Sequence, residues 1–377
     1  MITDLKVSNF RSLGEDVHVR FGNFTVLVGP NGSGKSNVVD ALRFVADALQ
    51  MGLSGAVTMR HGIGAVRRWI AGHPFNLAIE VQVSFPQGYG RYEFELTGAK
   101  AEEYRVIRES AEVWGPAGQH RFRIDRGEWK EGPDGLRPPI DDTSLALNAV
   151  GGDVRFKPLV HELQGVAIYS IFPDTLRVPQ KYSPLKPMSR HGDNWVSILR
   201  DQPKDTWKPD LIVALERLTG DIIDLKVSPA ASYLVAQFRH RSDTKVLKWF
   251  DGAQESDGTL RFAGIITALL QDPPVPVIGI EEPELTIHPG AVPLLVDYLK
   301  DASKRSQVIV TTHSPELLDR VDESDVRVVQ RIDGVSAVAT LHHRQLEAVR
   351  RGLLTLGELV RTEGLEQAEL LPDASAG

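Results

Sequence analysis

The 377-residue chain contains no cysteine. This absence excludes disulfide bonds, thiolate zinc sites and cysteine nucleophiles, so any metal must be held by oxygen or histidine. The chain also lacks an apolar run near the roughly 20 residues that span a bilayer, and its start shows no export or organelle-import pattern. We therefore expect a cytoplasmic protein without a membrane segment. A net charge of -7 argues against coating nucleic acid by bulk electrostatics, although a local basic groove stays compatible with it.

A glycine-rich segment is the strongest motif that the sequence does contain. GPNGSGKS, at residues 29–36, matches G-x-x-x-x-G-K-S in full and lies between the apolar run TVLV and a helix expected over residues 36–49. Its glycines turn backbone N–H groups toward phosphate, Lys35 supplies a point charge, and Ser36 reaches Mg²⁺. The cofactors predicted here are ATP and Mg²⁺. The predicted binding residues of this segment are Asn31, Gly32, Ser33, Gly34, Lys35, Ser36 and Asn37.

Two acids end the apolar strand in VPVIGIEEPE, and these are Glu281 and Glu282. Carboxylates at the tip of a buried strand need a cation or a proton, and ligands gather at the carboxyl ends of parallel strands. We predict that Glu281 binds Mg²⁺ and that Glu282 orients the attacking water. The alternative is a charged helix start, because glutamate is favoured there. Beside a complete phosphate loop, this alternative is less favoured.

Two further motifs complete the candidate site. TTHS, at residues 311–314, follows another apolar strand, so His313 is predicted at the same sheet edge as Glu282, within reach of the γ-phosphate or the attacking water. ESDGTLRF, at residues 255–262, opens an apolar helix whose N-terminus is a second anion site. We predict that Ser256, Asp257 and Gly258 cap the γ-phosphate held by another subunit. A lone structural histidine and a bare helix cap are the respective alternatives.

The pattern of elements predicts an α/β protein with several lobes. Short strands at the N-terminus and an antiparallel meander over residues 77–124 precede alternating helices and strands over residues 256–318, and a hairpin follows at residues 326–341. Residues 51–72, 127–142 and 173–192 are expected to be loops. We place an N-terminal lobe at 1–172, an inserted helical lobe at 173–272, a C-terminal lobe at 273–362 and a disordered tail at 363–377.

Taken together, five segments resemble the motifs of the RecF/SMC-like ABC ATPases. LKVSNFRSL, GPNGSGKSN, ESDGTLRF, IEEPELTIHP and TTHS are similar, in chain order, to the N-terminal arginine segment, Walker A, signature, Walker B with D-loop, and switch histidine. SDGTLRF and EPELTIHP more narrowly resemble the RecF-like predicted AAA ATPases related to the ATPase part of OLD-family proteins. The resemblance implies a P-loop NTPase of ABC-ATPase head type, with a mixed sheet, an antiparallel β subdomain and a helical lobe. Strands and loops instead of heptads lie between Walker A and the signature, so we expect no coiled-coil arm. The short segment after the switch histidine leads us to expect no nuclease domain.

The resemblance also assigns roles to single residues. It implies that Arg11 lies near the nucleotide or the dimer interface, that Ser256 and Gly258 contact the partner's γ-phosphate, and that His313 senses that phosphate. Walker B here carries Glu281 where aspartate is commoner, which favours contact with Mg²⁺ through a water. A Q-loop glutamine is not identifiable, and Gln164 is a weak candidate.

The function implied is an ABC-type ATPase that forms an ATP-sandwiched homodimer and hydrolyses ATP slowly, in DNA repair and maintenance or in defence against phage and plasmids. DNA and an effector protein encoded elsewhere stay open as partners. One alternative is a nucleotide-switched scaffold that regulates a separate effector without significant turnover. Another is a transporter motor subunit, which the FRS segment and the IEEPE form of Walker B fit poorly. Six arginines could form a basic surface or simply be solvated: Arg60, Arg67, Arg68, Arg121, Arg123 and Arg126.

Overall fold

The structure is a computed structural model that describes residues 1–377 except 71–72, 101, 117, 242–247 and 369–377. Its internal contacts divide the chain into two compact units. Unit 1 comprises Met1–Val166, Glu323–Leu353 and Gly364–Gly377, and unit 2 comprises Ala167–Asp322 and Leu354–Glu363. The lobe boundary expected after residue 272 therefore falls inside unit 2.

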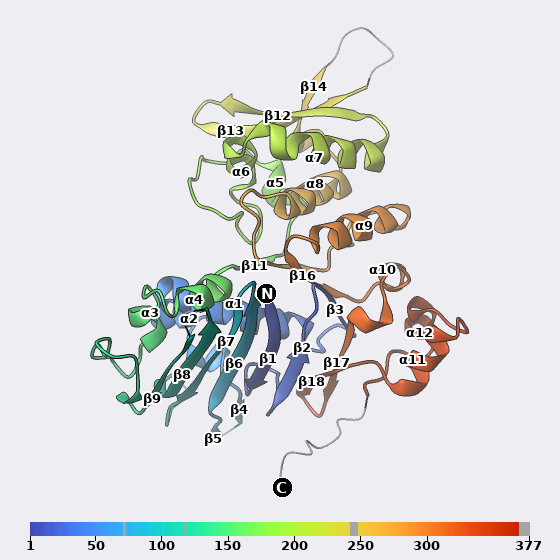
Figure 1. Ribbon diagram of the computed structural model, residues 1–377. Coiled ribbons are helices and arrows are strands. Elements are labelled where there is room, and N and C mark those ends of the chain that lie inside the picture. The colour runs from blue at the N-terminus through green and yellow to red at the C-terminus, as the bar shows by residue number, and fades with distance from the viewer. Residues whose placement is uncertain (71–72, 101, 117, 242–247, 369–377) are drawn as a thin grey trace. The chain divides into compact units, whose positions relative to one another are not determined.

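Unit 1 is built on a seven-stranded antiparallel sheet in the order β10-β9-β8-β7-β6-β1-β2 (Figure 1). One face of β6 is buried at every second residue, which is the period of a strand with one face on the core. The predicted meander is confirmed, with longer strands than the sequence indicated. The strands are β1 (Ile2–Ser8), β2 (Val17–Arg20), β6 (Leu77–Phe85), β7 (Gly88–Thr97), β8 (Arg105–Gly115), β9 (Gly118–Asp125) and β10 (Glu128–Glu131).

A second group of strands in unit 1 carries the phosphate loop. β3 (Phe24–Val28) is buried along its whole length and runs parallel to β17 (Val326–Ile332), which pairs with β18 (Val335–Ala339) in the predicted hairpin. A strand buried on both faces reads as a continuous apolar run, which is why TVLV was recognisable. α1 (Lys35–Met51) follows the loop, and its Phe44 ring lies 5.7 Å from Phe10 and 6.3 Å from Phe94.

Three expectations for unit 1 were wrong. Residues 51–72 are not simply a loop, because Leu53, Ala56 and Val57 give α2 (Leu53–Thr58) a buried face. Residues 127–142 include the edge strand β10. Part of the tail is held by backbone pairing, since His342 N donates to Glu366 O and Ala368 N donates to Thr340 O, both at 2.8 Å. Residues 369–377 lie outside the described residues. The other elements of unit 1 are η1 (Ile63–Ala65), β4 (Trp69–Ile70), β5 (His73–Pro74), α3 (Ala146–Val150), α4 (Lys157–Gln164), η4 (Glu323–Asp325) and α11 (His343–Arg350).

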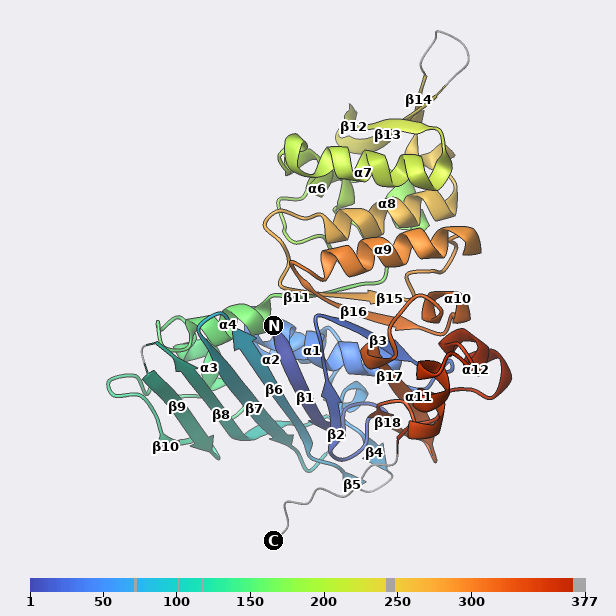
Figure 2. The same cartoon turned by 45° about the vertical axis from the view of Figure 1, so that its right-hand side comes forward.

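Unit 2 pairs β15 (Val277–Glu281) with β16 (Gln307–Thr312) in parallel, and β11 (Val166–Tyr169), which begins at the unit boundary, neighbours β15. α7 (Lys204–Thr219), α8 (Asp257–Leu269) and α9 (Val292–Ala302) lie one above another (Figure 2). α8 lies between α7 and α9, and both α8 and α9 contact the strands, so residues 273–322 pack with the helical lobe. Nearly every side chain of α8 is therefore buried.

The remaining elements of unit 2 include one correction. Residues 173–192, expected to be a loop, begin with the short helix α5, which packs on α8 through Leu176. Residues 242–247 lie outside the described residues, and the strand that follows them begins at Trp249. These elements are α5 (Pro173–Arg177), α6 (Trp195–Asp201), β12 (Ile222–Ala230), β13 (Tyr233–His240), β14 (Trp249–Asp251), η2 (Gly252–Gln254), η3 (Pro289–Ala291), α10 (Pro315–Leu318) and α12 (Leu356–Thr362).

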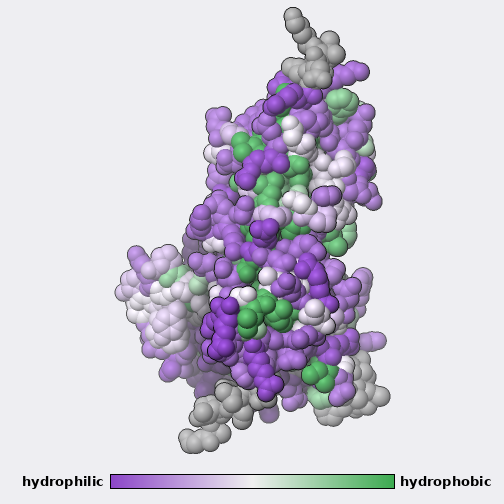
Figure 3. Space-filling model, turned by 90° about the vertical axis from the view of Figure 1, so that its right-hand side faces the viewer, coloured by the Kyte–Doolittle hydropathy of each residue, from purple (hydrophilic) through white to green (hydrophobic). Residues whose placement is uncertain are grey.

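Among the described residues, every helix is too short or too polar to cross a membrane. The face drawn in Figure 3 is mostly hydrophilic, with its hydrophobic groups in separate patches.

Candidate nucleotide-binding site

The phosphate loop, residues 29–36, joins β3 to α1 in unit 1. Gly32 and Gly34 have φ values of 76° and 108°, and Gly34 occupies the N-cap of α1. A glycine N-cap has no side-chain oxygen to offer, which suits a helix N-terminus that receives a phosphate. Lys35 is buried, and its ammonium donates to the carbonyls of Gly29 at 2.8 Å and Pro30 at 3.3 Å. Asn31 and Ser36 are exposed on the loop.

A series of hydrogen-bonded polar side chains supports the phosphate loop. The amide of Asn37 donates to the Ser12 hydroxyl at 2.6 Å, and that hydroxyl lies 2.7 Å from the hydroxyl of Ser336 in β18. A Cβ atom at Gly34 would come within 2.4 Å of the Ser336 hydroxyl oxygen. The sequence analysis missed Ser12 and Ser336, because only the fold brings three distant segments together here.

The close approach of Gly34 to Ser336 leads to a prediction about the free energy of unfolding. Gly34→Ala should lower the unfolding free energy by about 2 kcal/mol, since it adds the clash with Ser336 to the strain of a positive φ. Gly32→Ala has a positive φ but nothing within 4 Å of its added Cβ, so it should cost only about 1 kcal/mol. Urea unfolding without nucleotide measures both. Equal losses, or no recovery in Gly34→Ala/Ser336→Gly, would contradict this account.

Arg11 lies beside the first turns of α1. Its backbone has a φ of 50°, and its guanidinium lies 2.9 Å from Asp40 of α1. Asp40 also accepts a hydrogen bond from the guanidinium of Arg60 at 2.9 Å. The guanidinium of Arg60 lies 2.9 Å from Asp47 as well. Arg11 is thus held by a buried ion network that is anchored on the helix of the phosphate loop.

Two of the six arginines that could form a basic surface do not lie on the surface of the protein. Arg60 and Arg67 are buried, Arg60 in the network of α1 and Arg67 through bonds to the carbonyls of Gly98 and Lys100. Neither presents its charge to a ligand. Arg121, Arg123 and Arg126 are exposed, although Arg121 is paired with Glu131.

Gln164 is also excluded as the Q-loop residue. Its amide donates to the carbonyl of Leu49, near the end of α1 that lies opposite the phosphate loop. At 1.5 Å per residue, the two ends of α1 are about 25 Å apart.

The acidic strand end lies in unit 2. Glu281, the last residue of β15, is 8% exposed, and its carboxylate lies 2.6 Å from the guanidinium of Arg190. Glu282 follows with a φ of 45°, and its carboxylate lies 2.6 Å from Nδ1 of His313. The structure therefore places His313 beside Glu282, as the sequence predicted, and gives Glu281 a cationic partner that the sequence did not predict.

Two further residues hold this strand end, and both were missed. Arg261 of α8 is buried and donates to the carbonyls of Ile171, Glu281 and Glu282, the last at 2.8 Å. Glu284 accepts a hydrogen bond from Thr312, and burial raises the pKa of its carboxyl to about 7. Their signals were present in the sequence: a charge inside an apolar helix, and a third acid in EEPE.

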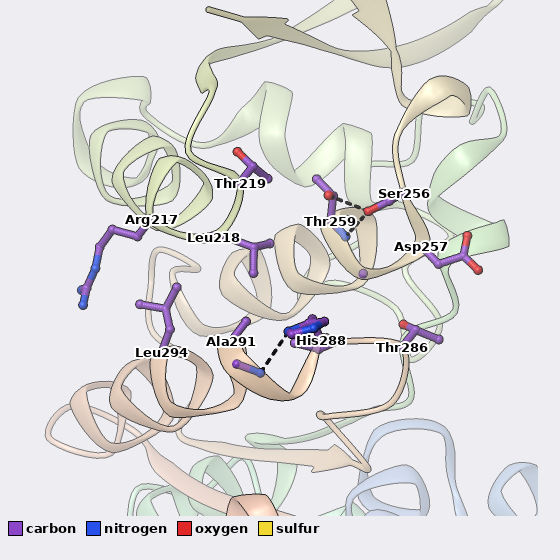
Figure 4. A pocket seen from close by; sticks show the side chains of 13 residues that line it. Arg217, Leu218, Thr219, Ser256, Asp257, Thr259, Thr286, His288, Ala291 and Leu294 are labelled. Atoms are coloured by element: carbon purple, nitrogen blue, oxygen red, sulfur yellow. Dashed lines mark hydrogen bonds between the residues drawn. The ribbon is translucent and has the colours of Figure 1, made fainter.

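The second anion site lies at the start of α8 and opens on a cavity of about 580 Å³ (Figure 4). The Ser256 hydroxyl caps the helix by accepting from Thr259 N at 3.1 Å, and Asp257 is paired with Arg177 of α5. A Cβ at Gly258 would come within 2.8 Å of the carbonyl of Thr286, so glycine permits this close contact. Unit 2 supplies all the residues that line the cavity: Arg217, Leu218, Thr219, Ser256, Asp257, Gly258, Thr259, Thr286, Ile287, His288, Gly290, Ala291 and Leu294.

Solved structures with a similar fold are heads of SMC proteins. An SmcHead bound to the C-winged helix domain of ScpA matches with a TM-score of 0.55 and 19% identity, over 92% of this chain and 99% of that chain. The Smc head domain with an extended coiled coil, bound to the C-terminal domain of ScpA derived from Pyrococcus furiosus, matches with a TM-score of 0.53 and 15% identity. This match covers 93% of this chain and 99% of that chain. These likenesses confirm the predicted ABC-ATPase head fold.

Sequence comparison identifies the protein families that two segments of the chain match. Residues 1–65 match the family described as "RecF/RecN/SMC N terminal domain", and residues 174–319 match "AAA domain, putative AbiEii toxin, Type IV TA system". Structural maintenance of chromosomes protein 1 of Saccharomyces cerevisiae is 52% identical over 46 residues, which are 12% of this chain and 4% of that protein. Chromosome partition protein Smc of Mycobacterium tuberculosis is 47% identical over 62 residues, which are 16% of this chain and 5% of that protein. These matches confirm the predicted resemblance to the RecF/SMC-like ABC ATPases.

The chain matches only a small fraction of the length of these curated relatives. Among the described residues between its phosphate loop and its signature segment, the longest helix that begins after α1 is α7, with 16 residues. Three β-strands, β12, β13 and β14, follow α7 and lead to the signature helix α8.

Proposed function

We propose that this protein binds and slowly hydrolyses ATP as a dimer in which each ATP is shared between two copies. The observation that carries the proposal is the location of the second anion site. The N-terminus of α8, with Ser256 and Gly258, opens on a cavity lined by unit 2, whereas the phosphate loop belongs to unit 1. In the RecF/SMC-like ABC ATPases that the chain resembles, such a signature segment completes the nucleotide site of a partner copy.

The residues present fit these roles chemically. Lys35 and the loop N–H groups would bind the phosphates, and the oxygens of Ser36 and Glu281 are ligands that suit Mg²⁺. When bound, Mg²⁺ would neutralise the charge that develops on the phosphates. Glu282 would accept a proton from the attacking water, and its contact with His313 holds its carboxylate in place. His313 would sense the γ-phosphate, and Arg11 would lie near the nucleotide or the interface.

The pathway belongs to the proposal as well. We infer a role in DNA repair and maintenance or in defence against phage and plasmids, carried out in the cytoplasm with DNA or an effector protein as partner. Chromosome partition proteins among the relatives, the toxin–antitoxin description of the AAA domain, and ScpA bound to similar heads support these partner classes. Arg121, Arg123 and Arg126 are the exposed arginines of the expected basic surface.

The Arg190–Glu281 ion pair favours a second candidate function. At 2.6 Å, the guanidinium neutralises the carboxylate that would bind Mg²⁺ and therefore competes with the metal. A chain in this state would bind nucleotide without turning it over, and would act as a nucleotide-switched scaffold for an effector. Absence of hydrolysis in the presence of DNA or a purified partner would select this function.

Mixing two inactive variants tests the shared site. Lys35→Ala removes the phosphate lysine and Ser256→Arg blocks the signature, so each homodimer has two defective sites. A mixed dimer contains one site with both defects and one intact site, so an equal mixture should regain about a quarter of wild-type ATPase activity. Each variant alone, at the same total concentration, is the control. If the mixture stayed as inactive as its components, the shared site would be wrong.

A further inference from the structure

Glu282, Glu284 and His313 form a compact group at the end of β15 and β16 in unit 2. Each offers one ligand atom, and these three atoms all lie within 4.8 Å of one another. Ligands of a tetrahedral ion at a bond length of about 2.1 Å lie roughly 3.4 Å apart, so a small side-chain movement would close this group around a metal. Nδ1 of His313 already lies 2.6 Å from Glu282.

The second observation concerns Glu284. The residue is only 8% exposed, and its Oε1 accepts from the Thr312 hydroxyl. Its buried Oε2 meets no hydrogen-bond donor among the described residues, and its carboxyl lies within hydrogen-bond reach of the Glu282 carboxylate. A buried carboxylate oxygen without a donor costs about 1–3 kcal/mol. A cation would satisfy this oxygen and would also compensate the charge of the neighbouring Glu282.

The ligand types select the metal. One imidazole with two carboxylates suits zinc, cobalt or manganese, whereas Mg²⁺ and Ca²⁺ prefer oxygen ligands alone. His313 has 44% of its side chain exposed, which gives an ion access from solvent. Coordination requires the lone pair on Nδ1, so a metal bound there would replace the present contact between Nδ1 and the Glu282 carboxylate.

We propose that Glu282, Glu284 and His313 bind a transition-metal dication such as Zn²⁺, at a site distinct from that of the Mg²⁺ bound with ATP. Metal binding here does not depend on nucleotide. Its consequence rests on the proposed function: the ion occupies the carboxylate that would accept a proton from water and the histidine that would sense phosphate. Zn²⁺ is therefore an inhibitor of hydrolysis.

Calorimetry with ZnCl₂ on the chelator-treated, nucleotide-free full chain tests the site. We expect one Zn²⁺ per chain with a Kd of about 1 μM or tighter, and His313→Ala and Glu284→Gln should each weaken it at least about 10-fold. His313→Cys supplies another zinc ligand and should restore binding. His288→Ala and Glu316→Gln remove an exposed histidine and an exposed glutamate of the same unit, and should leave the affinity unchanged.

The possible results distinguish failure of the metal site from failure of its inhibitory role and from failure of the proposed function. Absence of saturable Zn²⁺ binding, or equal affinity in wild type, His313→Ala and Glu284→Gln, overturns the metal site whatever the chain does with ATP. Thermal melting of each variant identifies one that has not folded, and His313→Cys then provides the test. Binding without inhibition of ATP hydrolysis overturns the inhibitory role alone. Failure of the mixing experiment leaves the metal titration unaffected, because that titration contains no nucleotide.

Discussion

Lys35→Ala is expected to weaken ATP binding about 10- to 100-fold while the chain stays folded. The lysine ammonium now donates to the carbonyls of Gly29 and Pro30, and a bound phosphate would replace these neutral acceptors by charged oxygens. A charge-assisted hydrogen bond contributes about 1.5–3 kcal/mol, twice or more the contribution of a neutral one. Titration with a fluorescent ATP analogue measures the affinity, and ATPase activity should fall with it at low ATP.

The matched control is Lys304→Ala, which removes the same charge from an exposed position at the C-terminal end of α9. It should bind ATP as the wild type does. Thermal unfolding without nucleotide should differ between Lys35→Ala and wild type by no more than about 1 kcal/mol, because the two carbonyls that lose a donor are neutral acceptors. If Lys35→Ala kept wild-type affinity, the glycine loop would not be the nucleotide site.

The parts of the fold that the sequence predicted well are those with a strong local signal. β3 and β15 are buried on both faces and appear as unbroken apolar runs, and the meander strands alternate with a period of two. The phosphate loop is recognisable because its chemistry needs glycines and a lysine at fixed spacing. The nearness of Glu282 to His313 followed from the same logic, since parallel strands carry their C-terminal residues to one edge of a sheet.

The features of the site that could not be predicted from the sequence depend on contacts between segments that are distant along the chain. Nothing near Glu281 in the chain indicates its ion pair with Arg190, and Gly34 meets Ser336 only because β18 lies behind the phosphate loop. The arginines show most clearly that residue type alone does not predict whether a side chain is buried. Arg60 and Arg121 looked alike as surface charges, yet Arg60 is buried between two aspartates and Arg121 lies on the exposed face of β9.

Glu282→Gln should reduce ATP hydrolysis by about 10²–10³-fold and leave ATP binding intact. Glutamine keeps the shape of the side chain and a hydrogen-bonding oxygen toward His313, but it cannot accept a proton from water. In the proposed cycle ATP closes the dimer and hydrolysis opens it, so slower hydrolysis should accumulate the closed form. With ATP and Mg²⁺ at micromolar protein concentration, light scattering should report a dimer for Glu282→Gln and a mixture for the wild type.

The control for this experiment is Glu316→Gln, the same chemical change at an exposed position of α10, which should keep wild-type turnover. A Glu282→Gln chain that binds ATP but stays monomeric would remove the shared site from consideration. One that dimerises and still hydrolyses ATP at the wild-type rate would show that another group accepts the proton. Glu284 is then the first alternative, because its carboxyl lies beside that of Glu282 and its pKa, raised by burial to about 7, suits a group that exchanges a proton near neutral pH.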